Sequence, residues 1–346
     1  MKGLIFIMKK IFTLIMVIIM SLTISGCEKK DTKNSANESS SKTSANIKGF
    51  HIDGTKLLDG NGNEFVMRGV NLAHSWYKED TPVCLKAIAK TGSNAVRIVL
   101  SDGRRWYKDE LESVKEIIKQ CKELKMIAIL EVHDPTGYDY QSHLDTAIDY
   151  WIEIKDALIG QEDYVIVNIA NEWYGQWDVD PWFEGYLNVI PKLREAGIKN
   201  TFMIDAAGWG QYPQSIIQSG KSLFEVDPLK NTMFSVHFYG SAGGYADKIQ
   251  STLESIREQG LCVCTGEFGY THSDGDVDED FIMQYCTEQD IGYLGWSWIG
   301  NSGGVEYLDI ALDNEGKKLS PEWGEKLING EYGIKKTSKI CSIFEN

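Results

Sequence analysis

The chain of 346 residues is 42% hydrophobic and 25% charged, and its formal net charge is −15. This composition is typical of a globular protein with ample apolar material for a core. The acidic excess argues against nucleic acid or an anionic membrane surface as a partner, because both need clustered Lys and Arg, whereas a neutral polymer is acceptable.

The N-terminus has the features of an exported lipoprotein. Two lysines precede the apolar run Ile11–Ile24, which leads into the tetrapeptide Ile24-Ser25-Gly26-Cys27. This order matches a signal peptide, and the tetrapeptide resembles a bacterial lipobox. The resemblance implies cleavage before Cys27, lipid attachment to its thiol, and an extracellular, cell-surface protein anchored to the membrane. An uncleaved membrane anchor is the alternative, although the run is shorter than the ~20 residues of a span; Met8 is an alternative start.

Four segments are therefore expected along the chain: a lipoprotein signal peptide over 1–26, a flexible linker over 27–47, one folded domain over 48–330 and a C-terminal tail over 331–346. The linker is rich in Ser, Lys, Asn and Asp and has no large apolar residue before position 47, a composition typical of disorder. The six cysteines beyond Cys27 have neither disulfide-framework nor zinc-site spacing, so no metal is expected.

Strands and helices alternate after a short hairpin around Asp53–Glu64, whose turn is predicted at Asp59–Gly62. Amphipathic helices are predicted at Lys108–Leu124, Leu144–Leu158 and Tyr245–Gln259. The predicted strands are Phe65–Val70, Ala95–Leu100, Ile127–Val132, Val165–Ile169, Thr201–Ile204, Thr232–Val236, Cys262–Thr265 and Ile291–Gly295.

This alternation predicts a parallel sheet covered by helices. An open, doubly wound sheet would normally carry a glycine-rich phosphate-binding turn after its first strand, and the run Arg68–Leu72 offers none. A single closed (β/α)8 TIM barrel with a short N-terminal hairpin is favoured, and it takes about 250 residues.

Two glutamates, Glu172 and Glu267, stand at the far ends of the fourth and seventh predicted strands. A barrel of this kind places its chemistry in the loops after the strands, so both carboxyl groups would lie over one mouth. Paired carboxyl groups over a cleft are typical of glycoside hydrolysis.

Further polar and aromatic side chains follow the same strands. Each alone has an ordinary structural explanation, but their convergence on one face predicts a functional site. The polar members are Arg97, His133, Asn171, His237 and Tyr239. Seven of the ten tryptophans fall at or after predicted strand ends, which favours platforms for sugar rings: Trp76, Trp106, Trp173, Trp177, Trp209, Trp296 and Trp298.

This combination resembles glycoside hydrolase family 5, with Asn171-Glu172 after the fourth strand, His237 and Tyr239 after the sixth and Glu267 after the seventh. The likeness runs from about residue 49 to 313 and is close to the bacterial endo-β-1,4-mannanases of that family. It is carried by the runs 68–77, 97–103, 169–175, 205–213 and 295–301. The resemblance implies an enzyme that cleaves internal β-1,4-mannosidic bonds of mannan, glucomannan or galactomannan with retention of configuration. A monomer without a cofactor is expected, although the sequence does not determine the oligomeric state.

The same resemblance assigns Glu172 as acid/base and Glu267 as nucleophile. It implies that Arg97 and Tyr239 hydrogen-bond Glu267, and that Asn171 contacts the sugar 2-hydroxyl. His133 and His237 would orient the sugar and Glu172. The remaining substrate-binding residues are expected to be Trp296, beneath the sugar that is cleaved, and His74 and Trp76, in the subsites on the non-reducing side.

Two other functions are compatible with the sequence. One is an endo-β-1,4-glucanase of the same family, because mannose and glucose differ only at the 2-hydroxyl. The other is a non-catalytic sugar-binding lipoprotein, which the presence of both glutamates disfavours. The acidic run Asp274–Asp280 alternates like a calcium loop but lacks the terminal bidentate Glu, so helix capping is the preferred interpretation.

Overall fold

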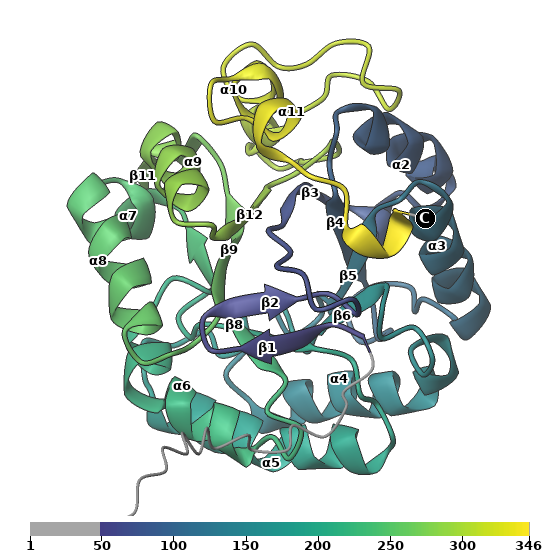
Figure 1. Cartoon of the computed structure of the whole chain (residues 1–346), viewed down its shortest axis with the longest axis vertical. Coiled ribbons are helices and arrows are strands. Elements are labelled where there is room, and N and C mark those ends of the chain that lie inside the picture. Colours follow the sequence, from purple (N-terminus) through teal and green to yellow (C-terminus); the bar gives the residue numbers. More distant parts are fainter. Residues whose placement is uncertain (1–48, 346) are drawn as a thin grey trace, which may run out of the picture. The chain divides into compact units, whose positions relative to one another are not determined.

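Eight parallel strands close into a barrel in the order β12-β3-β4-β5-β6-β7-β8-β9, as the computed structural model shows for residues 49–345 (Figure 1). The strands are β3 (Arg68–Leu72), β4 (Ala95–Leu100), β5 (Ile127–Val132), β6 (Val165–Asn168), β7 (Phe202–Asp205), β8 (Thr232–Phe238), β9 (Val263–Phe268) and β12 (Gly292–Gly295). All their residues are buried, as parallel strands covered on both faces require. The predicted (β/α)8 barrel is confirmed.

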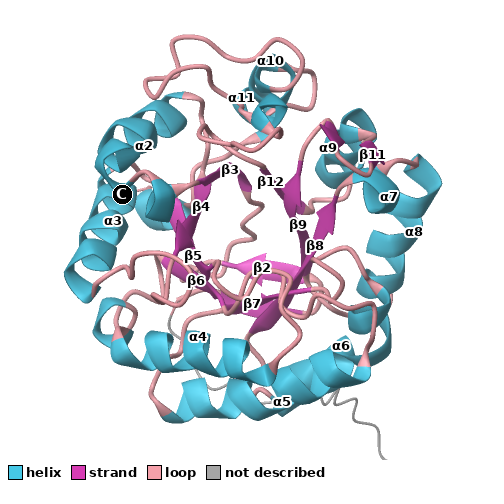
Figure 2. Cartoon of the chain, turned by 180° about the vertical axis from the view of Figure 1, so that it is seen from behind, coloured by secondary structure: helices cyan, strands magenta, loops and turns pink. Residues whose placement is uncertain are grey.

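Helices surround the strands on the outside (Figure 2). They are α2 (Thr81–Lys90), α3 (Leu111–Glu123), α4 (Gln141–Glu153), α5 (Asp180–Glu195), α6 (Gln214–Val226), α7 (Gly240–Gly243), α8 (Ala246–Arg257), α9 (Glu279–Glu288), α10 (Gly324–Asn329) and α11 (Ile334–Thr337). Helix α3 shows why they pack there: its buried residues Val114, Ile117, Ile118 and Cys121 recur at helical spacing and form one apolar face.

Short elements complete the described chain. Single turns of 3₁₀ helix span His74–Trp76, Lys78–Asp80, Lys155–Ala157, Glu306–Leu308 and Ser342–Phe344. A two-stranded ribbon, β10 (Thr271–His272) and β11 (Gly275–Asp276), follows β9. Between residues 49 and 345, no helix is both long enough and apolar enough to cross a membrane. The predicted signal peptide, lipidated Cys27 and linker lie outside the described residues.

The N-terminal hairpin, β1 (His51–Asp53) and β2 (Lys56–Leu58), lies across one end of the barrel (Figure 1). Phe50, Leu57 and Phe65 pack there with apolar residues from the starts of the barrel strands. A turn does form at the predicted positions 59–62, but it is not the turn that joins β1 to β2. Gly54, at φ +60, lies in the turn between β1 and β2, whereas 59–62 belong to a second turn that closes the pair Leu58 and Glu64.

The C-terminal segment 331–345 belongs to the same folded unit, and its last turns pack beneath the barrel. Cys341 joins the apolar cluster under the strands, Ser342 Oγ donates to Asp59 Oδ2 at 2.5 Å, and Asn94 Nδ2 donates to the carbonyl of Lys339 at 2.8 Å. The six cysteines of the described chain are all buried and free.

Candidate active site

Glu172 and Glu267 lie at the mouth formed by the carboxyl ends of the strands. Glu172 follows β6, and Glu267 is the fifth residue of β9. Both are largely buried, with 7% and 3% of their surfaces exposed. They line one cavity of about 370 Å³, and one oxygen of each carboxyl lies within 4.8 Å of the other. The fold therefore brings together two carboxyl groups that are far apart in the sequence.

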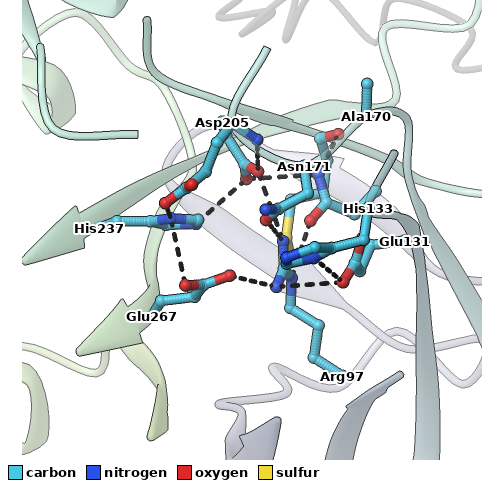
Figure 3. Close-up of polar contacts among 12 residues, drawn as sticks. Arg97, Glu131, His133, Ala170, Asn171, Asp205, His237 and Glu267 are labelled. Atoms are coloured by element: carbon cyan, nitrogen blue, oxygen red, sulfur yellow. Dashed lines mark hydrogen bonds and ion pairs between the residues drawn. The ribbon is translucent and has the colours of Figure 1, made fainter. Parts of the chain in front are cut away.

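Glu267 is held by two donors. Arg97 Nη1 donates to Oε1 at 2.7 Å (Figure 3). The Tyr239 hydroxyl donates to Oε2 at 3.0 Å. Burial alone would lower the pKa of Arg97, but the carboxylates of Glu131, Glu267 and Asp205 raise it, so the guanidinium stays charged. Burial and the Glu267 charge raise the pKa of Tyr239, so its hydroxyl remains a donor. The contacts fix the orientation of the Glu267 carboxyl group.

The surroundings of Glu172 differ from those of Glu267, because they favour a protonated carboxyl group. Burial raises the pKa of its carboxyl group, and the nearby charge of Glu267 raises it further, while the hydrogen bond from His237 partly offsets both. His237 Nδ1 lies 2.8 Å from Glu172 Oε1. Burial would lower the pKa of His237, but the carboxylates of Glu267 and Asp205 raise it to about 10. Two carboxyl groups with different environments suit an acid and a nucleophile.

The other predicted polar residues surround this pair. Asn171 is fully buried; its Oδ1 accepts from Arg97 Nη2 at 2.5 Å and its Nδ2 donates to Thr136 Oγ1 at 2.9 Å. His133 Nδ1 pairs with Glu131 Oε1 at 2.8 Å. Its ring stacks on Trp296, with centroids 5.6 Å apart and planes 20° apart.

Aromatic side chains extend the cavity into a cleft. Trp76, Trp106 and Trp296 line an adjoining space of about 410 Å³ together with the loop 300–302. Beyond the glutamates, Trp209 lines the first cavity and is 47% exposed. A chain of sugars therefore has apolar surfaces to stack on along both cavities.

Residues 58–302 match the family described as cellulase (glycosyl hydrolase family 5). The chain belongs to glycoside hydrolase family 5. It is 52% identical over 296 residues to a mannan endo-1,4-beta-mannosidase of Salipaludibacillus agaradhaerens. The aligned region covers 86% of this chain and 96% of that protein. A second mannan endo-1,4-beta-mannosidase, from Streptomyces lividans, is 42% identical, with 89% and 81% covered.

A solved structure shows the same relationship. The beta-mannanase from Thermomonospora fusca superposes with a TM-score of 0.82 at 44% identity, covering 86% of this chain and 99% of that one.

Three sequence predictions about this family 5 site need correction. His74 does not line either cavity: it is 3% exposed and pairs with Thr81 Oγ1 at 2.6 Å and Asp109 Oδ1 at 3.1 Å. The 3₁₀ turn at 74–76 buries His74 and leaves Trp76 at the cleft. Trp173 and Trp298, expected as sugar platforms, are 1% and 0% exposed and pack in the core.

Sequence reasoning missed an inner layer of polar residues beneath the two glutamates. Asn71 Oδ1 accepts from Arg97 Nη1 at 2.9 Å, and Asn168 Oδ1 accepts from Arg97 Nε at 2.8 Å. Glu131 and Asp205 lie within ion-pair distance of the same guanidinium. An acidic or amide residue inside an otherwise apolar strand is the signal that could have found them, because such a group must be paired when it is buried.

The family 5 site uses the only trio of possible metal ligands in residues 49–345, namely Glu172, His237 and Glu267. Arg97 and Tyr239 donate to the Glu267 oxygens, and His237 faces Glu172. The raised pKa of His237 favours its protonated form, which has no lone pair for a metal. No such group forms from the described side chains of 274–280. Asp278 instead caps α9 by accepting from the Phe281 N–H at 3.1 Å, so the capping interpretation is confirmed for this residue.

Proposed function

We infer that the protein is a retaining endo-β-1,4-mannanase that cleaves internal bonds of mannan, glucomannan or galactomannan. The observation that carries the mechanism is the closeness of the two carboxyl groups: one oxygen of each lies within 4.8 Å of the other. Retaining enzymes hold their carboxyl groups about 5–5.5 Å apart, whereas inverting enzymes need about 6.5–9.5 Å to admit a water molecule. The geometry supports double displacement.

In the first step, the Glu267 carboxylate attacks the anomeric carbon while Glu172 gives its proton to the departing glycosidic oxygen. The C–O bond to the leaving sugar breaks and an ester to Glu267 forms. Glu172 is then ionised, and loss of the Glu267 charge removes one cause of its raised pKa. In the second step, Glu172 takes a proton from water, whose oxygen displaces Glu267 from the same carbon.

The choice of mannan is supported by relatives rather than by the glutamates, because an endoglucanase would use the same pair. The named mannanases match over most of their length and this chain's length at 42–52% identity. An endoglucanase structure from Thermobifida fusca reaches only 21% identity, a likeness that extends to the fold but does not support a glucan substrate.

We expect kcat/KM on β-1,4-mannan and glucomannan to exceed that on carboxymethylcellulose at least tenfold, about 1.4 kcal/mol in transition-state discrimination. The test is reducing-sugar release from each polymer, with product length followed by chromatography. Short oligosaccharides from internal cleavage are expected. A preference for the cellulose derivative would make the protein an endoglucanase, and no release from any polymer would favour a sugar-binding protein.

We also propose that the enzyme is a cell-surface lipoprotein anchored through Cys27. The support is the order of charged, apolar and small residues before this cysteine. We expect the wild-type protein to partition with membranes, Cys27→Ser to be released or left unprocessed, and a fragment starting at Ile47 to remain active in solution. Fatty-acid labelling and membrane fractionation test this, and a Cys27→Ser protein that is still acylated and membrane-bound would refute it.

A further inference from the structure

Asp205 is a buried carboxylate that contacts Glu172 and His237 on the side away from the cleft. It is the last residue of β7, is 0% exposed, and is absent from the residues that line the two cleft cavities. Substrate in the cleft therefore cannot reach it. Its carboxyl group nevertheless lies next to groups from β4, β6 and β8 (Figure 3).

The first contact is with the backbone of Glu172. The Glu172 N–H donates to Asp205 Oδ2 at 3.0 Å. Glu172 has φ +49, in the left-handed region that non-glycine residues rarely adopt. Such a conformation costs on the order of 1 kcal/mol and persists only where neighbouring groups hold it. Asp205 supplies one such contact, at the residue whose side chain must reach the glycosidic oxygen.

The second contact is electrostatic and runs through His237. Asp205 Oδ1 lies 3.6 Å from His237 Nε2, and His237 Nδ1 faces Glu172 Oε1 at 2.8 Å. As an imidazolium, His237 carries a proton on each ring nitrogen. Nδ1 is within hydrogen-bond distance of Glu172, and Nε2 faces Asp205 at ion-pair distance, so the ring is held between two carboxyl groups. The carboxyl groups facing this ring are those of Glu172 from the β6 loop, Asp205 from β7 and Glu267 from β9.

Two further donors hold Asp205 itself in place. Arg97 Nη2 lies 3.4 Å from Oδ2, and Asn168 Nδ2 donates to Oδ1 at 3.3 Å. Burial alone would raise the pKa of Asp205, but the charges of His237 and Arg97 lower it strongly, so the group is a carboxylate across the working range. Asp205 therefore places a permanent negative charge next to the groups that hold Glu172.

We propose that Asp205 is a positioning residue for Glu172, acting through the Glu172 backbone and through His237 without touching the substrate. The proposal rests on the proposed function, because it assigns Asp205 to the proton-transfer steps of that reaction. It differs from a purely structural role, in which a buried ion pair stabilises the fold and leaves each folded molecule fully active.

The chain contains a matched control for that structural role. Asp227 is also 0% exposed and lies between β7 and β8, but it precedes β8, away from the catalytic mouth. It accepts from Arg194 Nε at 2.9 Å and Nη2 at 2.8 Å, and from the Asn231 N–H at 3.0 Å. Asp227→Asn therefore removes a buried, paired charge of the same kind without approaching Glu172.

The experiment compares Asp205→Asn and Asp227→Asn on two substrates. On mannan the leaving sugar needs a proton, whereas the leaving group of 2,4-dinitrophenyl β-mannobioside does not, and added azide replaces water without needing a base. For Asp205→Asn we expect kcat on mannan to fall about 100-fold, within the usual range for acid–base catalysis, with KM changed less than about threefold. On the aryl substrate with azide we expect a loss below about fivefold.

Asp227→Asn should lower Tm and leave kcat per folded molecule unchanged on both substrates. If Asp205→Asn behaves like this control, or loses activity equally on both substrates, the proposal is overturned. Wild-type protein on mannan is measured in the same series. If the wild type releases no sugar, the proposed function is wrong. If the wild type is active and the two variants behave alike, only the role of Asp205 is wrong.

A measurement on wild-type protein covers the case in which Asp205→Asn does not fold. Histidine side-chain NMR should show that His237 keeps its proton above pH 8, as expected for an imidazolium between carboxylates. Loss of the His237 proton near the ordinary value of about 6.5 would show that Asp205 does not hold a cation there, and would overturn the proposal.

Discussion

Glu267→Ala should lower turnover on mannan by about 10⁴-fold or more, because it removes the atom that bonds to the anomeric carbon. The space left by the side chain lies beside Arg97 and Tyr239, which donate to Glu267 in the native site. Azide can enter this space and attack from the same side. We therefore expect azide to restore activity on the dinitrophenyl substrate and to yield the α-mannosyl azide, whose configuration is inverted.

The control for this prediction is Glu112→Ala, on the exposed surface of α3, which should match the wild type. The product configuration is read by NMR. Wild-type turnover in Glu267→Ala, or an azide product of retained configuration, would remove Glu267 from the role of nucleophile.

Glu172→Ala should lower turnover on mannan by about 10³-fold or more but leave the first step on the dinitrophenyl substrate near the wild-type rate, since that leaving group needs no proton. Rapid mixing should show a burst of dinitrophenol, because the ester to residue 267 then lacks a base for its hydrolysis.

The raised pKa of Glu172 also predicts how activity depends on pH. In the wild type, kcat/KM on mannan should fall as pH rises through that pKa, because the acid loses its proton.

This basic limb should be missing from the first step of Glu172→Ala on the dinitrophenyl substrate. If the limb persists there with the wild-type midpoint, another group is the acid.

Much of the fold was predictable because parallel strands buried on both faces are continuous apolar runs. Strands β4 and β5 coincide with the predicted bounds 95–100 and 127–132. Two strands are longer than predicted because each ends in a polar residue followed by a phenylalanine. Strands β8 and β9 continue to Phe238 and Phe268 and so include His237 and Glu267, which hydrophobicity places after the strands. The alternation of polar and apolar residues in 53–64 also could not fix which of two turns joins β1 to β2.

In the candidate site, too, some residues could be predicted from the sequence and others could not. The glutamates and Trp296 stand at strand ends, so the barrel alone predicts that they share a mouth. The burial of His74, Trp173 and Trp298 depends on loop conformation, which a run of residues does not reveal. The importance of Asp205 depends on its distance from the Glu172 N–H and from His237, and such distances exist only in the folded chain.

The most direct test of double displacement is the anomeric configuration of the first product. Wild-type enzyme is mixed with mannohexaose in deuterated buffer, and proton NMR follows the new reducing end before mutarotation. Two successive displacements at one carbon, by Glu267 and then by water, predict that the β anomer appears first and the α anomer grows in later. An α anomer appearing first would mean a single displacement and would contradict the assignment of Glu267 as nucleophile.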